Sequence, residues 1–204
     1  MPNTDNPFGL RPVQHRNGAP YTGACKPYYI PAAYGTALYL GDPVVITGAV
    51  NTAAVNAPGA GSFPVGALPV VAKATAGDGN ALTGVIVGFA GTRDSLVYNA
   101  ASTERVVMVA DDPDLMFEIQ ADGTVTPGDV GFNAVLIYTH GGSTATGRSG
   151  AELDTTSDVP AADASNQLTI RGFVNREDND MASANSKVLV TINQHTFASG
   201  AIGI

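Results

Sequence analysis

The side chains with the most chemical potential are carboxylates in two short runs. Asp111-Asp112-Pro113-Asp114 places three carboxylates within four residues, and Glu177-Asp178-Asn179-Asp180 places three more. Carboxylate oxygens are the ligands that hard cations such as Ca²⁺ prefer, but neither run has the spaced ligands and the glycine of an EF-hand loop. Asp and Pro are also ordinary turn formers. We interpret both runs as solvated turns, with a Ca²⁺-dependent structural role of Asp111, Asp112 and Asp114 as an alternative.

The other reactive side chains are scattered along the chain. Cys25 is the only cysteine, so it cannot form an intramolecular disulfide, and its surroundings match no cysteine-enzyme signature. The three histidines, His15, His140 and His195, show none of the close spacings of a zinc site. The sequence holds no Gly-x-Ser-x-Gly nucleophile elbow and no Walker lysine. We predict a protein without enzymatic activity, cofactor or bound metal.

The composition indicates the kind of scaffold that carries these residues. The chain has 204 residues, of which 24 are glycine and 13 are proline, and this share is well above the usual level of about 12%. So many helix breakers exclude a helical bundle, whereas 44% hydrophobic residues with only 14% charged residues allow a packed core. We predict an all-β fold of short strands, a β-barrel or a jelly-roll-like sandwich, with an extended N-terminal arm.

Several segments show strand patterns between turn residues. Residues 82–90, 105–110 and 134–139 are short runs rich in β-branched side chains. In residues 115–120, apolar and more polar residues alternate as in a half-buried strand, and similar alternation occurs near residues 168–174 and 187–192. Asp122-Gly123 predicts a two-residue hairpin turn into a strand at 124–126. Helical pattern is scarce, with a turn or two at most over residues 177–185.

Residues 1–40 differ in character from the body at 41–204. Residues 1–41 hold three basic residues and one acidic residue, whereas the rest of the chain holds seven basic and seventeen acidic residues. Five of the seven tyrosines fall between residues 21 and 39, interleaved with prolines that favour extended backbone. Such an arm is suited to lie across a protein surface. We predict that it forms a capsid or subunit interface through Arg11, Arg16, Tyr21, Lys26, Tyr28, Tyr29 and Tyr34.

The charge balance limits the partners. The net charge is −8 and the isoelectric point is about 4.6, so we expect no nucleic acid partner, because phosphate binding needs a clustered basic face. Residues 43–72 carry no charge, but their prolines and polar residues disqualify them as a bilayer helix. The first residues lack the features of a signal peptide, so we expect synthesis in a cytoplasm and no membrane partner.

Longer stretches of the chain resemble one protein family in their general residue pattern. They are the arm at 6–12, Gly41-Asp42-Pro43-Val44-Val45, and the segments 68–74, 84–89, 109–120 and 188–195. Together they resemble the capsid cement, or decoration, proteins of tailed bacteriophages. The resemblance spans most of the chain, and none of its motifs is diagnostic of chemistry.

The resemblance implies a structural protein of the virion. Cement proteins are β-rich and non-enzymatic, assemble as dimers or trimers, and clamp neighbouring major capsid subunits on the outer surface of the head. The expected partners are therefore the major capsid protein and further copies of this chain. A glycan- or host-surface-binding β-module of a tail, fibre or head fibre is the alternative. A major capsid protein is not expected, because its usual folds carry a long helix that this sequence does not offer.

Overall fold

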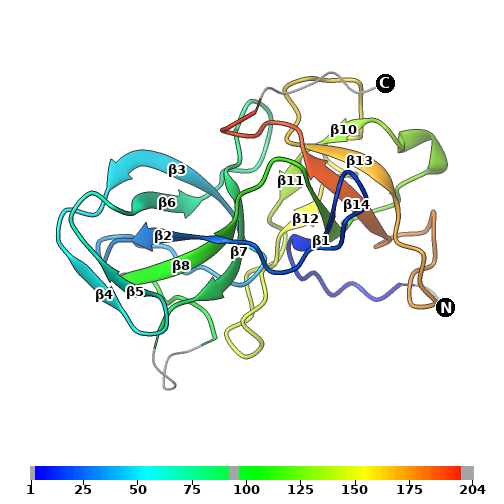
Figure 1. Cartoon of the computed structure of the whole chain (residues 1–204). Helices are drawn as coiled ribbons and strands as arrows, with labels where there is room; N and C mark the ends of the chain where they lie inside the picture. Colours follow the sequence, from blue (N-terminus) through cyan, green and yellow to red (C-terminus); the bar gives the residue numbers. More distant parts are fainter. Residues whose placement is uncertain (1–2, 92–96, 199–204) are drawn as a thin grey trace.

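The computed structural model describes residues 3–91 and 97–198 and is built almost entirely of short β-strands (Figure 1). A closed barrel occupies one side of the molecule and a five-stranded sheet the other. The predicted all-β fold is confirmed. In the described residues, no helix is long and apolar enough to span a membrane.

The barrel has the strand order β2-β6-β3-β7-β8, and β8 pairs with β2 to close it. Its strands are β2 (Lys26–Ile30), β3 (Pro43–Val50), β6 (Pro69–Lys73), β7 (Gly84–Phe89) and β8 (Arg105–Ala110), with β4 (Val55–Ala57) and β5 (Gly61–Phe63) as a separate hairpin. The pair β2–β6 is parallel and the others are antiparallel. β-Branched residues such as Val44, Val71 and Val107 fill the interior, as expected for a small barrel.

The second half is the antiparallel sheet β1-β9-β14-β13-β10. Its strands are β1 (Arg11–His15), β9 (Leu115–Gln120), β10 (Asn133–Ala134), β13 (Leu168–Phe173) and β14 (Lys187–Ile192), accompanied by the pair β11 (Leu136–Ile137) and β12 (Glu152–Leu153) and by the 3₁₀ helix η1 (Pro127–Asp129). Its main core includes Phe117, Ile170 and Val190, and Leu82 and Val85 join that core from the barrel side. One continuous core therefore connects the two halves.

The predicted alternation along β9 holds, but both faces of the strand are covered. Leu115, Phe117 and Ile119 lie in the core, while Glu118 and Gln120 on the opposite face are also buried. The N-terminal segment covers that second face, since the Asn6 N–H donates to Gln120 Oε1 at 2.9 Å. Polar residues are tolerated there because each has a hydrogen-bond partner.

Residues 1–40 contribute a strand to each half of the molecule. β1 pairs with β9 and β2 pairs with β8, and Leu10 is buried in the main core. The N-terminal segment crosses the turn before β3 at close range, where the Leu10 N–H donates to the Gly41 carbonyl at 2.9 Å. Residues 3–40 thus pack along the body of their own chain. The role of residues 1–40 as a separate interface arm, distinct from the body at 41–204, stays a prediction.

The predicted hairpin at Asp122-Gly123 is wrong. No strand follows at residues 124–126, and Thr124 instead forms an isolated bridge with Ala184. The Asp122 carboxylate accepts hydrogen bonds from the N–H and the hydroxyl of Thr155, at 2.8 and 3.0 Å. A distant segment thus uses the side chain that would have stabilised the local turn. Residues 177–185 form turns without a helix.

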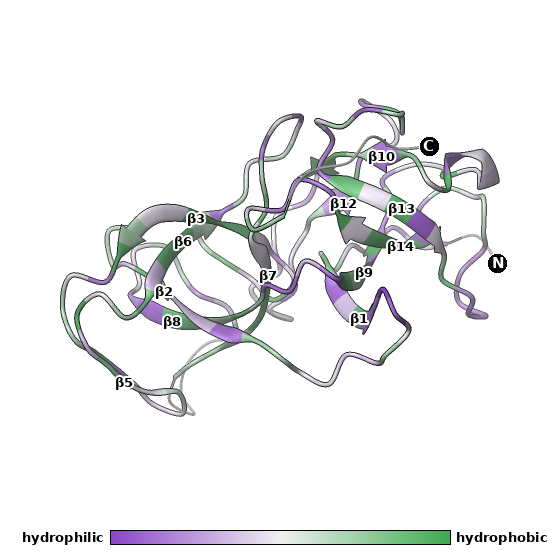
Figure 2. Cartoon of the chain, turned by 45° about the horizontal axis from the view of Figure 1, so that its top comes forward, coloured by the Kyte–Doolittle hydropathy of each residue, from purple (hydrophilic) through white to green (hydrophobic). Residues whose placement is uncertain are grey.

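The charge-free residues 43–72 form most of the barrel end that carries the β4–β5 hairpin, away from the five-stranded sheet (Figure 1). The outer half of β3 and the loops around the hairpin are exposed there. In Figure 2 the most hydrophilic loops lie mainly around the five-stranded sheet. The two ends of the molecule therefore present different chemistry to solvent.

Candidate binding surfaces

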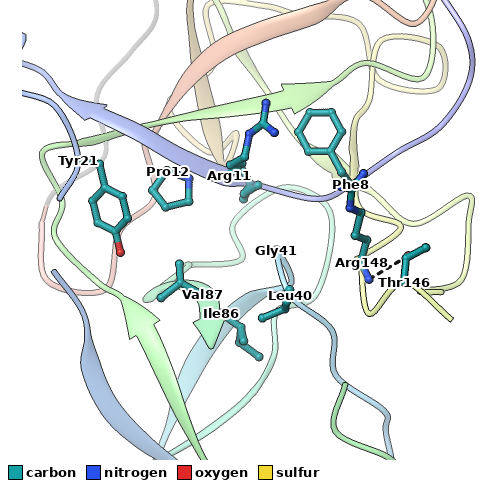
Figure 3. A pocket seen from close by; sticks show the side chains of 11 residues that line it. Phe8, Arg11, Pro12, Tyr21, Leu40, Gly41, Ile86, Val87, Thr146 and Arg148 are labelled. Atoms are coloured by element: carbon teal, nitrogen blue, oxygen red, sulfur yellow. Dashed lines mark hydrogen bonds between the residues drawn. The ribbon is translucent and has the colours of Figure 1, made fainter. Parts of the chain in front are cut away.

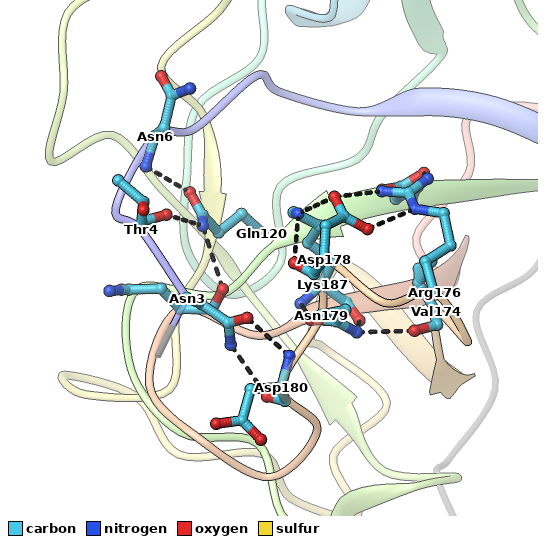
Figure 4. A network of polar contacts seen from close by, with 12 residues as sticks. Asn3, Thr4, Asn6, Gln120, Val174, Arg176, Asp178, Asn179, Asp180 and Lys187 are labelled. Carbon is cyan, nitrogen blue, oxygen red and sulfur yellow. Dashed lines mark hydrogen bonds and ion pairs between the residues drawn. The ribbon is translucent and has the colours of Figure 1, made fainter. Parts of the chain in front are cut away.

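Arg11, one of the predicted interface residues, binds a buried carboxylate of its own chain. Arg11 Nη2 lies 2.5 Å from Glu118 Oε2, and Arg176 donates to both Glu118 oxygens at 3.0 and 2.6 Å. Arg176 also binds Asp178, which in turn binds Lys187 at 2.6 Å (Figure 4). Hydrogen bonds from Arg176 and then Lys187 hold the pKa of Asp178 well below its usual range. These ion pairs connect β1 to β9 and β14.

The first residues of the chain belong to the same polar network. The Asn3 amide donates to the Asp180 carbonyl at 2.9 Å and accepts from the Asp180 N–H at 2.8 Å. Gln120 Nε2 donates to the Thr4 carbonyl at 2.8 Å (Figure 4). A cavity of about 430 Å³ lies among these residues, and its lining also includes Arg148. The network holds the N-terminal segment against the sheet.

Lys26 and Arg16 also have partners within the chain. Lys26 Nζ and the Tyr28 hydroxyl both lie 2.9 Å from Asp111 Oδ2, and Arg16 Nη1 lies 3.9 Å from Asp114 Oδ1. Tyr28 is buried, and burial followed by its hydrogen bond to Asp111 raises the pKa of its hydroxyl. Carboxylates of the 111–114 run therefore accept from the arm.

The remaining predicted tyrosines are half-buried. The Tyr21 hydroxyl donates to the Ala24 carbonyl at 3.0 Å, and its ring packs against the main core. Tyr29 packs under the β4–β5 hairpin, and the Tyr34 hydroxyl accepts from the Lys73 N–H at 2.8 Å. Every predicted interface residue thus has a contact within its own chain. Their intersubunit role stays a prediction.

A pocket of about 350 Å³ lies beside the N-terminal segment (Figure 3). Apolar side chains from residues 8–12, from Tyr21 and from β7 line it together with two guanidinium groups; the lining includes Phe8, Leu10, Tyr21, Leu40, Ile86, Val87, Arg11 and Arg148. Apolar walls with a few polar groups are typical of small-molecule sites. Phe8, Arg11 and Arg148 also line the cavity described above.

The junction of the two halves contains a buried ion pair. Asp42 is fully buried, and its carboxylate accepts from the Ser149 hydroxyl at 2.5 Å and from the Tyr39 N–H at 2.8 Å. Lys73 Nζ lies 3.3 Å from Asp42 and 4.3 Å from the ring centre of Tyr138. Burial raises the pKa of Asp42, and Lys73 opposes that rise. The Ser149 hydroxyl is buried and donates to Asp42, so it links the segment around residue 149 to the turn before β3 and is not placed to attack a substrate.

One cluster of side chains with metal-binding atoms is not predicted from the sequence. Within the described ranges, the only group of three or more His, Cys, Asp or Glu donors gathered at one point is Asp5, His140 and Glu152. The predicted cation candidates do not form such a group. No sequence signal marks the cluster, because the pairing of β11 with β12 brings His140 beside Glu152, and Asp5 joins them through the packing of the N-terminal segment.

The exposed residues between 47 and 66, at one end of the barrel, carry no charge, and Glu104 and Arg105 border them beside Val55 and Pro58. Val50 and Val65 expose 46% and 63% of their surface there, and small residues and prolines surround them. Protein–protein interfaces are depleted of charged residues at their centre. This surface, defined by the exposed residues between 47 and 66, is therefore a candidate interface, which we name the uncharged tip.

Comparison with known proteins gives no relative. No family model matches the chain, and neither a curated protein nor a solved structure matches it.

Proposed function

We propose that this protein is a non-enzymatic structural component of a tailed-phage virion. It is made in the host cytoplasm, binds the outer surface of the assembled head as a homodimer or homotrimer, and clamps neighbouring major capsid subunits against the pressure of packaged DNA. A clamp that binds only the assembled shell stabilises the shell by its own binding free energy, and many copies add up through avidity.

The observation that supports this proposal best is the uncharged tip. Its exposed residues include Val50 and Val65 and carry no charge, on a protein whose net charge is −8, and Glu104 and Arg105 mark its border. Depletion of charged residues is typical of the centre of a protein interface. The barrel beneath it is closed and packed, so the tip is presented on a rigid support.

The proposal is tested first by copy number. Particles of the source phage are dissociated mildly, and released and retained proteins are measured against the major capsid protein by quantitative mass spectrometry. We expect copies in amounts comparable to the capsid subunit, and shells that become heat-sensitive when the protein is lost. A few copies per particle, or none, would contradict a cement role.

The role of the tip is tested with matched variants. Val65→Asp adds a charge to the tip, and Val159→Asp adds the same charge in the loop between β12 and β13, where Val159 is 64% exposed. Because both side chains are exposed, both variants should fold. We expect Val65→Asp to weaken rebinding to stripped capsids at least about tenfold, since one buried charge in an interface costs more than 1.4 kcal/mol. Val159→Asp should rebind like the parent.

A glycan- or host-surface-binding role is the second candidate. The pocket of Figure 3 favours it, because Tyr21 offers an aromatic face and Arg148 a guanidinium group, beside Phe8, over whose ring Arg11 lies at 5.1 Å. Glycan-array binding by the isolated protein that is lost in Tyr21→Ala would support this role. Low copy number together with such binding would replace the cement proposal.

A further inference from the structure

Three side chains from distant segments bring metal-binding atoms together beside the N-terminal segment. Asp5 precedes β1, His140 follows β11, and Glu152 belongs to β12. One donor atom of each lies within 4.8 Å of the others. His140 Nδ1 is 3.0 Å from Glu152 Oε2, and His140 Nε2 is 3.5 Å from Asp5 Oδ2. These two contacts involve different ring nitrogens, and an imidazole binds one cation through a single nitrogen, so the candidate donor set is one nitrogen of His140 with one oxygen each of Asp5 and Glu152.

Glu152 has an oxygen that the protein leaves without a partner. The side chain is 1% exposed, and its Oε2 contacts the Thr139 hydroxyl and His140. Its Oε1 is buried and has no hydrogen-bond partner among the described residues. A buried carboxylate oxygen without a partner is costly. A cation bound by both oxygens of Glu152 would remove that cost.

We propose that Asp5, His140 and Glu152 bind one divalent first-row transition ion, with Zn²⁺ as its best representative. An imidazole nitrogen with two carboxylates suits these ions, whereas Ca²⁺ takes oxygen ligands. The Thr139 hydroxyl beside Glu152 orients that carboxylate in the manner of an outer-shell partner. Asp5 and His140 expose nearly half of their side chains, so water can complete the coordination.

The bound ion would fasten the N-terminal segment to the second half of the molecule. Without it, residues 3–6 are held by hydrogen bonds such as those from Asn3 and Gln120. A ligand that binds only the folded chain stabilises it in proportion to its concentration over its dissociation constant. Metal binding should therefore raise the melting temperature as well as give a binding signal.

The test is titration of the full chain, freed of metal with a chelator, with ZnCl₂ at pH 8, where imidazole is neutral. We expect one Zn²⁺ per chain by calorimetry, a higher melting temperature, and no such response to CaCl₂. Co²⁺ should give visible absorption bands that saturate at one equivalent. His140→Gln should weaken binding at least about 100-fold, since it removes a ligand and not merely an outer-shell partner.

A matched control distinguishes binding at this site from weak binding by any histidine that lies beside a carboxylate. His15 Nδ1 lies 3.3 Å from Asp112 Oδ2, and this pair does not belong to a gathered set of three donors among the described residues. His15→Gln should therefore bind Zn²⁺ like the parent. Asp5→Asn, an exposed substitution that cannot disturb the core, should weaken binding and abolish the thermal shift. Absence of stoichiometric binding, or binding that His140→Gln and Asp5→Asn leave unchanged, would overturn the proposal.

Discussion

At the scale of single residues, buried polar side chains of this chain bind partners from distant segments. Asp42 and Glu118 are both buried, and their partners come from other strands or loops. Breaking a buried ion pair on one side leaves the other charge uncompensated, which costs more than the net contribution of the intact pair. Substitution of either residue should therefore lower the stability of the contact between the segments that it joins.

We expect Asp42→Asn to lower the free energy of unfolding by about 3 kcal/mol, because Lys73 loses its counter-charge at the junction. Urea denaturation at pH 7.5 measures the change. Glu177→Gln, at an exposed carboxylate, is the control and should stay within about 0.5 kcal/mol. If Asp42→Asn behaves like that control, the pair does not support the junction.

His195 should make stability depend on pH. Its side chain is buried, and burial lowers its pKa below the ordinary value of 6.5. The unfolded chain therefore binds a proton that the folded chain rejects, so stability falls as pH drops below 6.5 toward the folded pKa. One proton gives a slope of at most about 1.4 kcal/mol per pH unit. Urea midpoints measured from pH 7.5 to 5 should show a shallower slope for His195→Asn, and an unchanged slope would contradict this assignment.

The sequence did not predict which side chains would contact one another in the candidate sites. The charges of Arg11 and Lys26 indicate interface residues, but their partners Glu118 and Asp111 lie more than 80 residues away along the chain. Those pairings depend on strand register between β1, β2 and the body. Asp5, His140 and Glu152 were missed for the same reason.

At the scale of elements, local pattern was sufficient for the strands with strong alternation or β-branched runs. The segments predicted at 105–110 and 115–120 coincide with β8 and β9, and β7 lies within the segment predicted at 82–90. The parallel pair β2–β6 and the hairpin β4–β5 were not predicted. Pairing between distant segments leaves no periodic signal, and strands of three residues, such as β4 and β5, are too short to show one.

The crossing of the N-terminal segment over the turn at residue 41 should tolerate no side chain. Gly9 has a φ of +74°, and an added Cβ would lie 2.4 Å from the Gly41 carbonyl oxygen. We expect Gly9→Ala to cost at least about 2 kcal/mol, from the left-handed backbone and the overlap together. Thermal or urea unfolding measures this cost.

Gly23→Ala is the matched control for that variant. Gly23 has a φ of +90° with open space around it, so its alanine variant should show only the conformational part, about 1 kcal/mol. Equal losses at the two positions would mean that the close crossing at Gly9 adds nothing.

At the scale of the whole molecule, most of the basic side chains that the structure describes form ion pairs within their own chain. Of the nine basic residues in the described ranges, at least six bind carboxylates of their own chain: Arg11, Arg16, Lys26, Lys73, Arg176 and Lys187. An interface at the uncharged tip should therefore respond weakly to salt. We expect affinity for stripped capsids to change less than about threefold between 50 and 500 mM NaCl, since screening acts on exposed charges. A much steeper loss in a binding assay would favour docking through the basic residues of the arm.

The strand order also sets when each half can form during synthesis. All barrel strands lie within residues 26–110, so the barrel can close before the second half leaves the ribosome. β1 is made first, but its neighbour β9 lies about 100 residues later, and the partners of Asn3 lie at residues 180–184. The residues that are synthesised first are thus among the last to form their native contacts. Until then, β1 remains an unpaired strand on a nascent protein, the kind of segment that pairs wrongly or recruits a neighbour.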